Sequence, residues 1–224
     1  MIILLGSQKG GTGKSTLSVN ICAELLRLKK TVLLIDADAQ GTSNNWSQDR
    51  ENTNNLPHLD CLQKYGNIRK TLLELSDRYD YIVVDTAGHD SKELRSGLTA
   101  ADILLTPFKP SQPDLDTMAR LDEIIEEAKI INEELKCFAC LNMSPTNPVV
   151  NEAKEARKLL NEFSSISIIP TIIRERKAFR DTISQGLGVV ETQHSKAKAE
   201  IQNLVNDILK ELESKKEKME LSHA

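Results

Sequence analysis

The sequence predicts a doubly wound α/β domain, with a mostly parallel sheet flanked by helices. Short, almost uninterrupted apolar runs indicate strands buried on both faces, and they alternate with segments of helical periodicity. Repetition of strand, helix and strand builds parallel sheets with right-handed crossovers. The composition agrees, because 224 residues with 39% hydrophobic and 28% charged residues suit one well-filled domain. We expect this domain to span residues 1–212, followed by a charged tail, 213–224, that frays.

The strand assignments rest on short apolar runs with few polar interruptions. They cover residues 2–5, 31–35, 81–84, 103–106, 137–141 and 167–169. Helices are expected where apolar residues recur every three or four positions, at 15–28, 114–132, 151–163 and 197–212. The polar stretch 41–57 shows neither pattern, so it is expected to be an exposed loop.

The strongest motif is the run QKGGTGKST at residues 8–16, between the first expected strand and the first expected helix. Glycines let a backbone wrap closely around phosphate, and loop N–H groups at a helix N-terminus attract anions. Lys14 is expected at the β- and γ-phosphates, the Ser15 hydroxyl at Mg²⁺ and Thr16 at the α-phosphate. The remaining cradle residues are Gly10, Gly11, Thr12 and Gly13. The run therefore predicts a site for ATP with Mg²⁺.

Acidic residues follow the next two expected strands. Asp36 and Asp38 end the second strand, and Asp85 ends the strand-like run YIVVD. Carboxylates at the carboxyl ends of parallel strands lie where open α/β sheets bind ligands. Asp85 is expected to hold the Mg²⁺ coordination sphere, through water, and Asp36 to support the metal or the loop. Gly88 is expected to bring a backbone N–H near the γ-phosphate.

The phosphate loop departs from the usual G-x-x-x-x-G-K-[ST] pattern, because Gln8 replaces the first glycine and Lys9 follows it. Its K-G-G-T-G-K-S resembles the deviant Walker A motif of the ParA/MinD family of ATPases. The resemblance implies an ATP-dependent sandwich homodimer in which Lys9 reaches the partner's phosphates. Residues 36–41 are similar to the family's switch I, which implies that Asp38 orients the attacking water beside the metal. Ala39 stands where that switch usually has proline.

The resemblance extends to the base-binding region. Asn142 ends a strand where the family presents a side chain to adenine, and an amide suits adenine's donor and acceptor edge. An asparagine that only begins a helix or turn remains the alternative. Pro170 and Thr171 are expected to form the other wall of the base pocket. Residues 101–114 resemble the strand and turn that line the family's dimer face.

The most basic stretch contains Arg174, Arg176, Lys177 and Arg180, in a chain with a net charge of −4. It resembles a segment of short plasmid-type ParA proteins, which implies DNA binding without sequence preference in the ATP state. The resemblance also implies a ParB-like or other adaptor protein, hydrolysis that is weak until that partner stimulates it, and plasmid or chromosomal DNA as cargo. A solvated helix face with a few nucleotide contacts is the alternative interpretation of these cations.

Other functions remain open at this stage. The same switch could position a protein organelle or complex, or act at a membrane as MinD does. The apolar stripe of residues 201–212 would suit a membrane, but its polar face mixes acids with bases, so packing on the sheet and no membrane contact are expected. No apolar run approaches about 20 residues, and no signal peptide is recognised, so the cytoplasm is expected, with nucleoid association in the ATP state.

The cysteine pair at 137 and 140 raises a further alternative, an iron–sulfur carrier of the same superfamily. In a strand, side chains three positions apart point to opposite faces, so two such sulfurs do not converge. We therefore expect Cys137 and Cys140 to be ordinary core residues.

Overall fold

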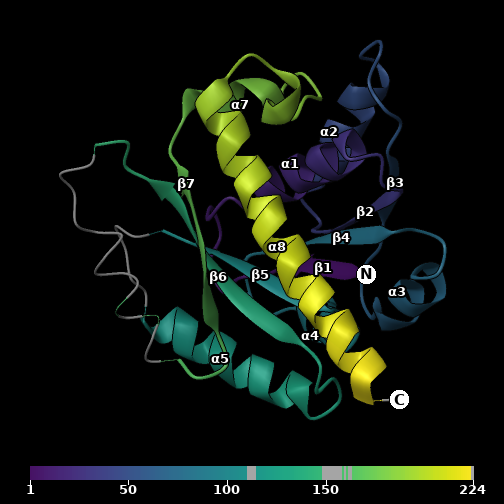
Figure 1. Ribbon diagram of the computed structural model, residues 1–224, viewed down its shortest axis with the longest axis vertical. Coiled ribbons are helices and arrows are strands. Elements are labelled where there is room, and N and C mark those ends of the chain that lie inside the picture. The colour runs from purple at the N-terminus through teal and green to yellow at the C-terminus, as the bar shows by residue number, and fades with distance from the viewer. Residues whose placement is uncertain (110–114, 148–157, 159, 161–162, 223–224) are drawn as a thin grey trace.

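The structure, a computed structural model, describes residues 1–109, 115–147, 158, 160 and 163–222 (Figure 1). Within these residues one seven-stranded sheet has the order β3-β2-β4-β1-β5-β6-β7, and its neighbouring strands are parallel. The expected doubly wound α/β class is confirmed. The strands are β1 (Ile2–Leu5), β2 (Val32–Ala37), β3 (Asp60–Gln63), β4 (Tyr81–Thr86), β5 (Ile103–Phe108), β6 (Lys136–Ser144) and β7 (Ser167–Arg174).

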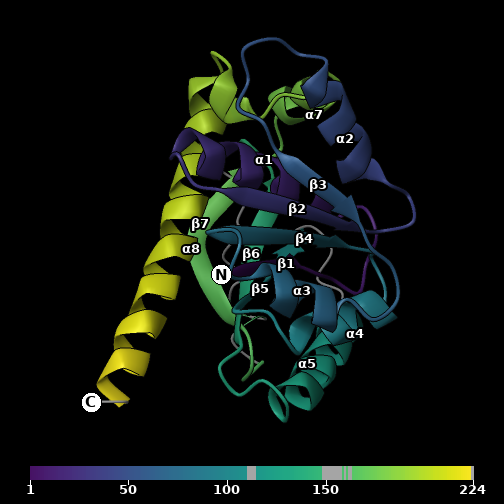
Figure 2. The ribbon, with the colours of Figure 1, turned by 90° about the vertical axis from the view of Figure 1, so that its right-hand side faces the viewer.

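Helices cover both faces of this sheet (Figures 1 and 2). One apolar cluster joins α1, α7 and α8 to one face, and a second joins α3, α4 and α5 to the other. Neighbouring strand residues divide between the clusters: Ile3 belongs to the first and Leu4 to the second, and both are fully buried. The helices are α1 (Lys14–Arg27), α2 (Thr42–Glu51), α3 (Arg69–Leu75), α4 (Lys92–Leu98), α5 (Leu115–Lys129), α7 (Lys177–Ile183), the 3-10 turn η1 (Val189–Glu191) and α8 (Ser195–Ser222).

The strand order brings three functional segments together. β1 pairs with β4 so that Leu5 lies beside Asp85, and β2 pairs with β4 so that Asp36 lies beside Asp85. The phosphate loop follows β1, so it emerges at the same edge of the sheet as both carboxylates. This edge is where ligands bind in open parallel sheets.

The structure corrects several boundaries. Residues 42–51, expected in a loop, form α2, and α8 continues to Ser222 beyond the expected end near residue 212. β7 runs to Arg174 rather than ending at 169. The sequence prediction stopped at Pro170, but β7 is an edge strand, where a proline is tolerated. The helix expected at 151–163 and the turn at 110–114 lie mainly outside the described residues.

Cys137 and Cys140 are free core cysteines on opposite faces of the sheet, as expected. Cys140 belongs to the apolar cluster on one face of the sheet and Cys137 to the cluster on the other. Burial raises the pKa of each thiol to about 12. Buried, protonated thiols on opposite faces cannot ligate one iron–sulfur cluster.

Among the described residues, no helix is long and apolar enough to span a bilayer.

Candidate nucleotide site

A cavity of about 290 Å³ lies at the carboxyl edge of the sheet, over the start of α1. Most of the phosphate-site residues expected from the sequence meet there. Its lining consists of Gly10, Gly11, Gly13, Lys14, Ser15, Thr16, Asp38, Gln40, Thr42, Gly88 and Met143. Thr12 is buried beneath the loop, where its hydroxyl lies 3.3 Å from that of Ser7. The cavity is therefore built from the phosphate loop on one side and the two segments that follow β2 and β4 on the other.

The backbone of the loop needs glycine at two positions. Gly11 and Gly13 have φ angles of 70° and 93°, in the left-handed region that other residues rarely adopt. Gly13 is also the N-cap of α1, and no side chain caps the helix there. The first N–H groups of α1 are thus left for a ligand, and the helix dipole favours an anion.

Lys14 is held inside the site. Its ammonium donates to the Ser7 hydroxyl at 3.0 Å and to the Lys9 carbonyl at 3.4 Å. Burial lowers the pKa of Lys14, while the charges of Asp85 and Asp38 oppose that change. Ser7, which sequence reasoning missed, also donates to the Lys9 carbonyl at 2.8 Å. One small hydroxyl therefore contacts both segments that carry the motif's lysines.

Lys9 itself borders a neighbouring hollow of about 30 Å³ rather than the phosphate cavity. The hollow is lined also by the end of β5 and by Thr117 and Met118 at the start of α5. The two motif lysines therefore lie on different sides of the loop, Lys14 within the cavity and Lys9 at its margin.

The carboxylates at the strand ends have different surroundings. Asp36 is fully buried and accepts from the backbone N–H of Asp38 at 3.1 Å and of Asn44 at 2.8 Å. It therefore fixes the loop after β2 and the first turn of α2. Asp38 is half-buried on the cavity lining, and its carboxylate accepts from the Gln40 N–H at 3.0 Å. Of the two roles considered for Asp36, loop support matches these contacts.

Asp85 is fully buried, as Asp36 is. It accepts from the Ser43 hydroxyl at 2.9 Å through Oδ2, while Oδ1 has no hydrogen-bond partner among the described residues. Burial raises the pKa of Asp85 to about 6, although the Ser15 and Ser43 hydroxyls oppose the rise. A buried carboxylate oxygen without a partner, beside a serine hydroxyl, is a donor set that fits Mg²⁺. Ser43 could not be predicted as a site residue, because the stretch 41–57 is expected to be a loop and Ser43 lies in α2.

Gly88 lies directly against the phosphate loop. A Cβ added at Gly88 would come within 2.6 Å of the Gly10 Cα and 2.8 Å of the Lys9 carbonyl oxygen. Only glycine permits this approach of two backbones. The segment after β4 is therefore in contact with the phosphate loop before any ligand is considered.

Asn142 reaches the phosphate loop from β6. Its amide donates to the Thr12 carbonyl at 2.7 Å, and it is 3% exposed. The next residue, Met143, has a φ of 52° and lines the phosphate cavity. Asn142 thus supports the loop from behind, and its expected role at adenine stays a prediction.

A second cavity, of about 90 Å³, adjoins Asn142 and Met143. Leu17, Ile173 and Phe179 give it an apolar lining. Its far wall is formed by Ile173 and Arg174 at the end of β7 and by Glu175 and Arg176 beyond it, whereas Pro170 and Thr171 do not line it. Thr171 instead donates to Asp207 of α8 at 2.6 Å, and Pro170 lines a hollow near the start of β6. The expected role of Pro170 and Thr171 at the base stays a prediction.

The basic stretch is divided rather than presented as one patch. Arg176 pairs with Glu200 at 2.6 Å, and Arg174 donates to the Pro145 carbonyl at 2.8 Å. Both arginines line the second cavity, and so does Arg180. Lys177 and Arg180 point outward, with side chains 81% and 69% exposed, and pair with Asp181 and Glu175. The first pair of cations is therefore half-buried and the second pair is exposed.

Known proteins resemble this chain over most of its length. The family described as ATPase MipZ matches residues 1–134. The maintenance of carboxysome distribution protein A of Halothiobacillus neapolitanus is 27% identical over 212 residues, covering 92% of this chain and 95% of that protein.

Solved structures share the fold. A putative plasmid partition protein from Borrelia burgdorferi B31 bound to AMPPNP has a TM-score of 0.73 at 21% identity, covering 93% of this chain and 98% of that one. The septum site-determining protein MinD from Pyrococcus horikoshii OT3, complexed with Mg-ADP, has a TM-score of 0.70 at 16% identity, covering 92% and 95%. With the family match over more than half of its length, and with a glycine-rich loop and strand-end carboxylates around one cavity, this chain belongs to the ParA/MinD family of ATPases.

Proposed function

We propose that this ATPase is a dimerisation switch. In its ATP state it binds DNA without sequence preference, and with an adaptor protein it segregates or positions plasmid or chromosomal DNA. The observation that carries the proposal is the pair of lysines on either side of the loop, one in the phosphate cavity and one at its margin. Lys14 serves the ATP bound to its own chain. Lys9, at the margin of the cavity, is directed to the phosphates held by a second copy.

The cavity suggests a role for each group in hydrolysis. Loop N–H groups and Lys14 hold the phosphates, and Ser15 with Asp85 would hold Mg²⁺, which supplies charge neutralisation of the phosphates. Asp38, on the cavity lining, orients the attacking water. Gly88 directs its backbone N–H at the γ-phosphate, so that its segment distinguishes ATP from ADP. Positive groups fixed around the transferred phosphoryl account for most catalysis of this type.

Lys9→Ala tests the sandwich. We expect the ATP-dependent dimer to weaken by at least about thirtyfold, since removing one partner of a buried charge pair costs about 2 kcal/mol or more. Analytical ultracentrifugation with AMPPNP measures the dimer, and Lys30→Ala, at an exposed lysine beyond the end of α1, is the control for loss of a lysine. A Lys9→Ala protein that dimerises and hydrolyses ATP like the parent would rule out the sandwich.

DNA contact is assigned to Lys177 and Arg180. Their partners are themselves exposed, and exposed ion pairs are worth at most about 1 kcal/mol, so phosphate can replace them. Arg174 and Arg176 are assigned instead to the second cavity, which we propose receives the base together with Asn142. If both exposed cations contact phosphate in each protomer, the slope of log K against log salt is about −3.6.

A salt series on random duplex DNA tests this assignment. The Asp38→Ala protein is used with ATP, to hold the ATP state, and with ADP. We expect binding with ATP only, and the double variant Lys177→Ala/Arg180→Ala should lose most of the affinity and the slope. Lys70→Ala removes an 86% exposed lysine elsewhere and should change neither. A clear ATP dimer without DNA binding would exclude DNA as the matrix and favour a protein track or a membrane.

A protein cargo is the second candidate. It is favoured by the similarity to a protein whose name refers to carboxysome distribution. The nucleotide switch would be unchanged, and only the adaptor would differ. Identification of the adaptor by co-purification with the ATP-state protein would separate the two.

A further inference from the structure

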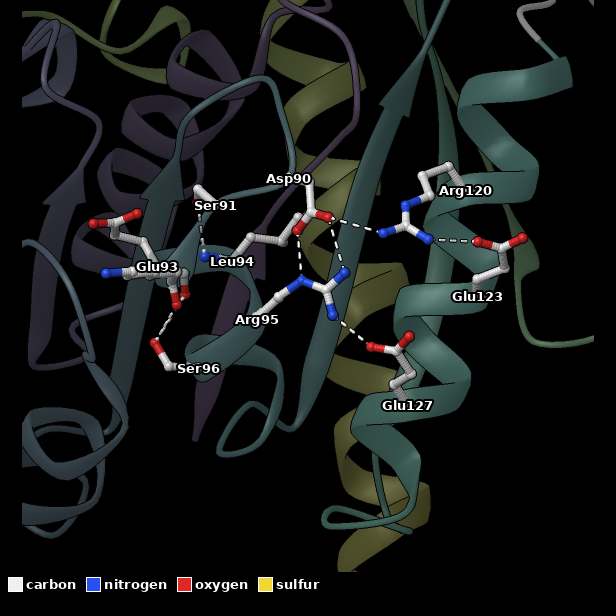
Figure 3. A network of polar contacts seen from close by, with 10 residues as sticks. Asp90, Ser91, Glu93, Leu94, Arg95, Ser96, Arg120, Glu123 and Glu127 are labelled. Carbon is white, nitrogen blue, oxygen red and sulfur yellow. Dashed lines mark hydrogen bonds and ion pairs between the residues drawn. The ribbon is translucent and has the colours of Figure 1, made fainter.

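The segment that carries Gly88 is anchored on the side away from the phosphate loop. Two residues beyond Gly88, the carboxylate of Asp90 receives Arg95 of α4 in a two-pronged arrangement, with N–O distances of 2.6 and 2.8 Å (Figure 3). Arg120 of α5 donates to the same carboxylate at 3.3 Å. Three hydrogen bonds from two helices therefore converge on one acid in the loop after β4.

The two arginines are themselves held in place. Arg95 also pairs with Glu127 of α5, and Arg120 pairs with Glu123 at 2.7 Å (Figure 3). The neighbouring Ser91 caps α4 by accepting from the Leu94 N–H at 3.1 Å, so the chain enters a helix immediately after Asp90. The loop from β4 to α4 thus has a fixed end only one residue from the carboxylate.

The contact between Arg95 and Asp90 has a more defined geometry than an isolated ion pair on the surface. Isolated exposed ion pairs contribute little, but a two-pronged arginine–carboxylate contact fixes orientation as well as charge. The Asp90 side chain is 32% exposed, and the arginines lower its pKa. This carboxylate therefore stays ionised and bonded across the neutral range.

At its other end, the loop between β4 and α4 carries Gly88, whose position relative to the phosphate loop is tightly restricted. Gly88 lies against Gly10 and the Lys9 carbonyl with no room for a Cβ. The same α5 that receives Asp90 through Arg120 also lines the hollow beside Lys9 through Thr117 and Met118. A short loop held between the phosphate loop and two helices has little freedom to move Gly88.

We propose that Asp90 is a positioning residue, which holds the Gly88 backbone N–H in register with the γ-phosphate through Arg95 and Arg120. The inference rests on the proposed role of Gly88 and adds the group that fixes it. Asp90 touches neither nucleotide nor metal in this scheme. Its effect is confined to the state in which a γ-phosphate is present.

Asp90→Asn tests the inference through nucleotide preference rather than activity. Calorimetry measures the affinity of the full chain for AMPPNP and for ADP, both with Mg²⁺. We expect AMPPNP binding to weaken about tenfold with ADP binding unchanged, since loss of a hydrogen bond to a charged group costs about tenfold or more in affinity. A general loss of folded structure would weaken both nucleotides alike, and an unchanged AMPPNP-to-ADP ratio would refute the positioning role.

Matched variants come from the same network. Glu123→Gln and Glu127→Gln remove acids that touch Arg120 and Arg95 but not the loop, and they should leave the nucleotide ratio unchanged. Arg95→Gln should lower the AMPPNP-to-ADP ratio as Asp90→Asn does. The double variant Asp90→Asn/Arg95→Gln should have no larger effect than either single variant, because the two residues form one contact. If the two glutamate variants change the nucleotide ratio as much as Asp90→Asn does, the effect belongs to the whole network and the positioning role of Asp90 is wrong.

Gly88→Ala separates this inference from the function on which it rests. If Gly88→Ala lowers the AMPPNP-to-ADP ratio and Asp90→Asn does not, Gly88 keeps its role and Asp90 loses it. If Gly88→Ala leaves the ratio unchanged, the proposed contact of Gly88 with the γ-phosphate is wrong, and the positioning role falls with it. Urea denaturation of each variant shows that the compared proteins are folded.

Discussion

Asp38→Ala is expected to reduce the rate of ATP hydrolysis by about 10²–10⁴-fold, the range for loss of a group that handles a proton or water in the transition state. Asp38 lies on the lining of the phosphate cavity, and its backbone is fixed by Asp36 and by the turn to Gly41, whose N–H donates to the Asp38 carbonyl at 2.9 Å. The loop N–H groups and Lys14, which hold the phosphates, are untouched. ATP binding should therefore persist, and the dimer should accumulate in the ATP state.

Single-turnover hydrolysis, measured beside equilibrium binding of ATP, checks this expectation. Asp49→Ala is a suitable control, because Asp49 is an exposed acid of α2 away from the cavity. A variant at Asp38 that turns over ATP at the parental rate would remove the water-orienting role. If the variant loses ATP binding and hydrolysis together, Asp38 contributes to binding of ATP in the ground state rather than to the hydrolysis step.

Arg50→Ala is expected to lower the free energy of unfolding by about 3–5 kcal/mol, because it leaves Glu191 with its charge buried and unpaired. The Arg50 side chain is 3% exposed and that of Glu191 is 11% exposed, and their two contacts are 2.8 and 2.7 Å. Arg50 also donates to the Gly186 carbonyl at 3.2 Å and lies 5.3 Å from the centre of the Trp46 ring. One guanidinium therefore joins α2 to the segment that leads into η1.

Thermal unfolding followed by circular dichroism measures this loss, which for a chain of this size corresponds to a melting temperature lower by about 10 °C. Lys70→Ala, which breaks an exposed pair, should stay within about 0.5 kcal/mol of the parent. Arg50→Met with Glu191→Leu should recover much of the loss, because no charge is then left buried. If Arg50→Ala alone is as stable as the parent, the bridge has no structural weight.

The sequence predicted the sheet and the phosphate site better than the segments around them. Strands such as Ile103–Phe108 are apolar on both faces, and the glycines of the phosphate loop carry their chemistry in their order. Gly88 could also be assigned to the phosphate site from the sequence, because it contacts the backbone of the phosphate loop rather than a particular side chain. These features depend on local pattern, so they are visible without knowledge of the fold.

Features that depend on distant partners were not visible. α2 has a polar sequence, and it is held by Trp46, whose ring N–H donates to the Leu187 carbonyl, and by Arg50. Ser7 and Ser43 are common residues whose importance comes only from the lysine and the carboxylate beside them. The pairing of Arg176 likewise required the position of α8, which supplies Glu200.

The position of Trp46 has a practical consequence for kinetics. It is the single tryptophan of the chain and is 1% exposed, on a helix whose first turn is bonded to Asp36 and Asp85. Its intrinsic fluorescence therefore comes from one site, between the loop that carries Asp38 and the segment before η1. A stopped-flow trace of unlabelled protein mixed with ATP would report any shift of α2 on nucleotide binding, without an attached dye.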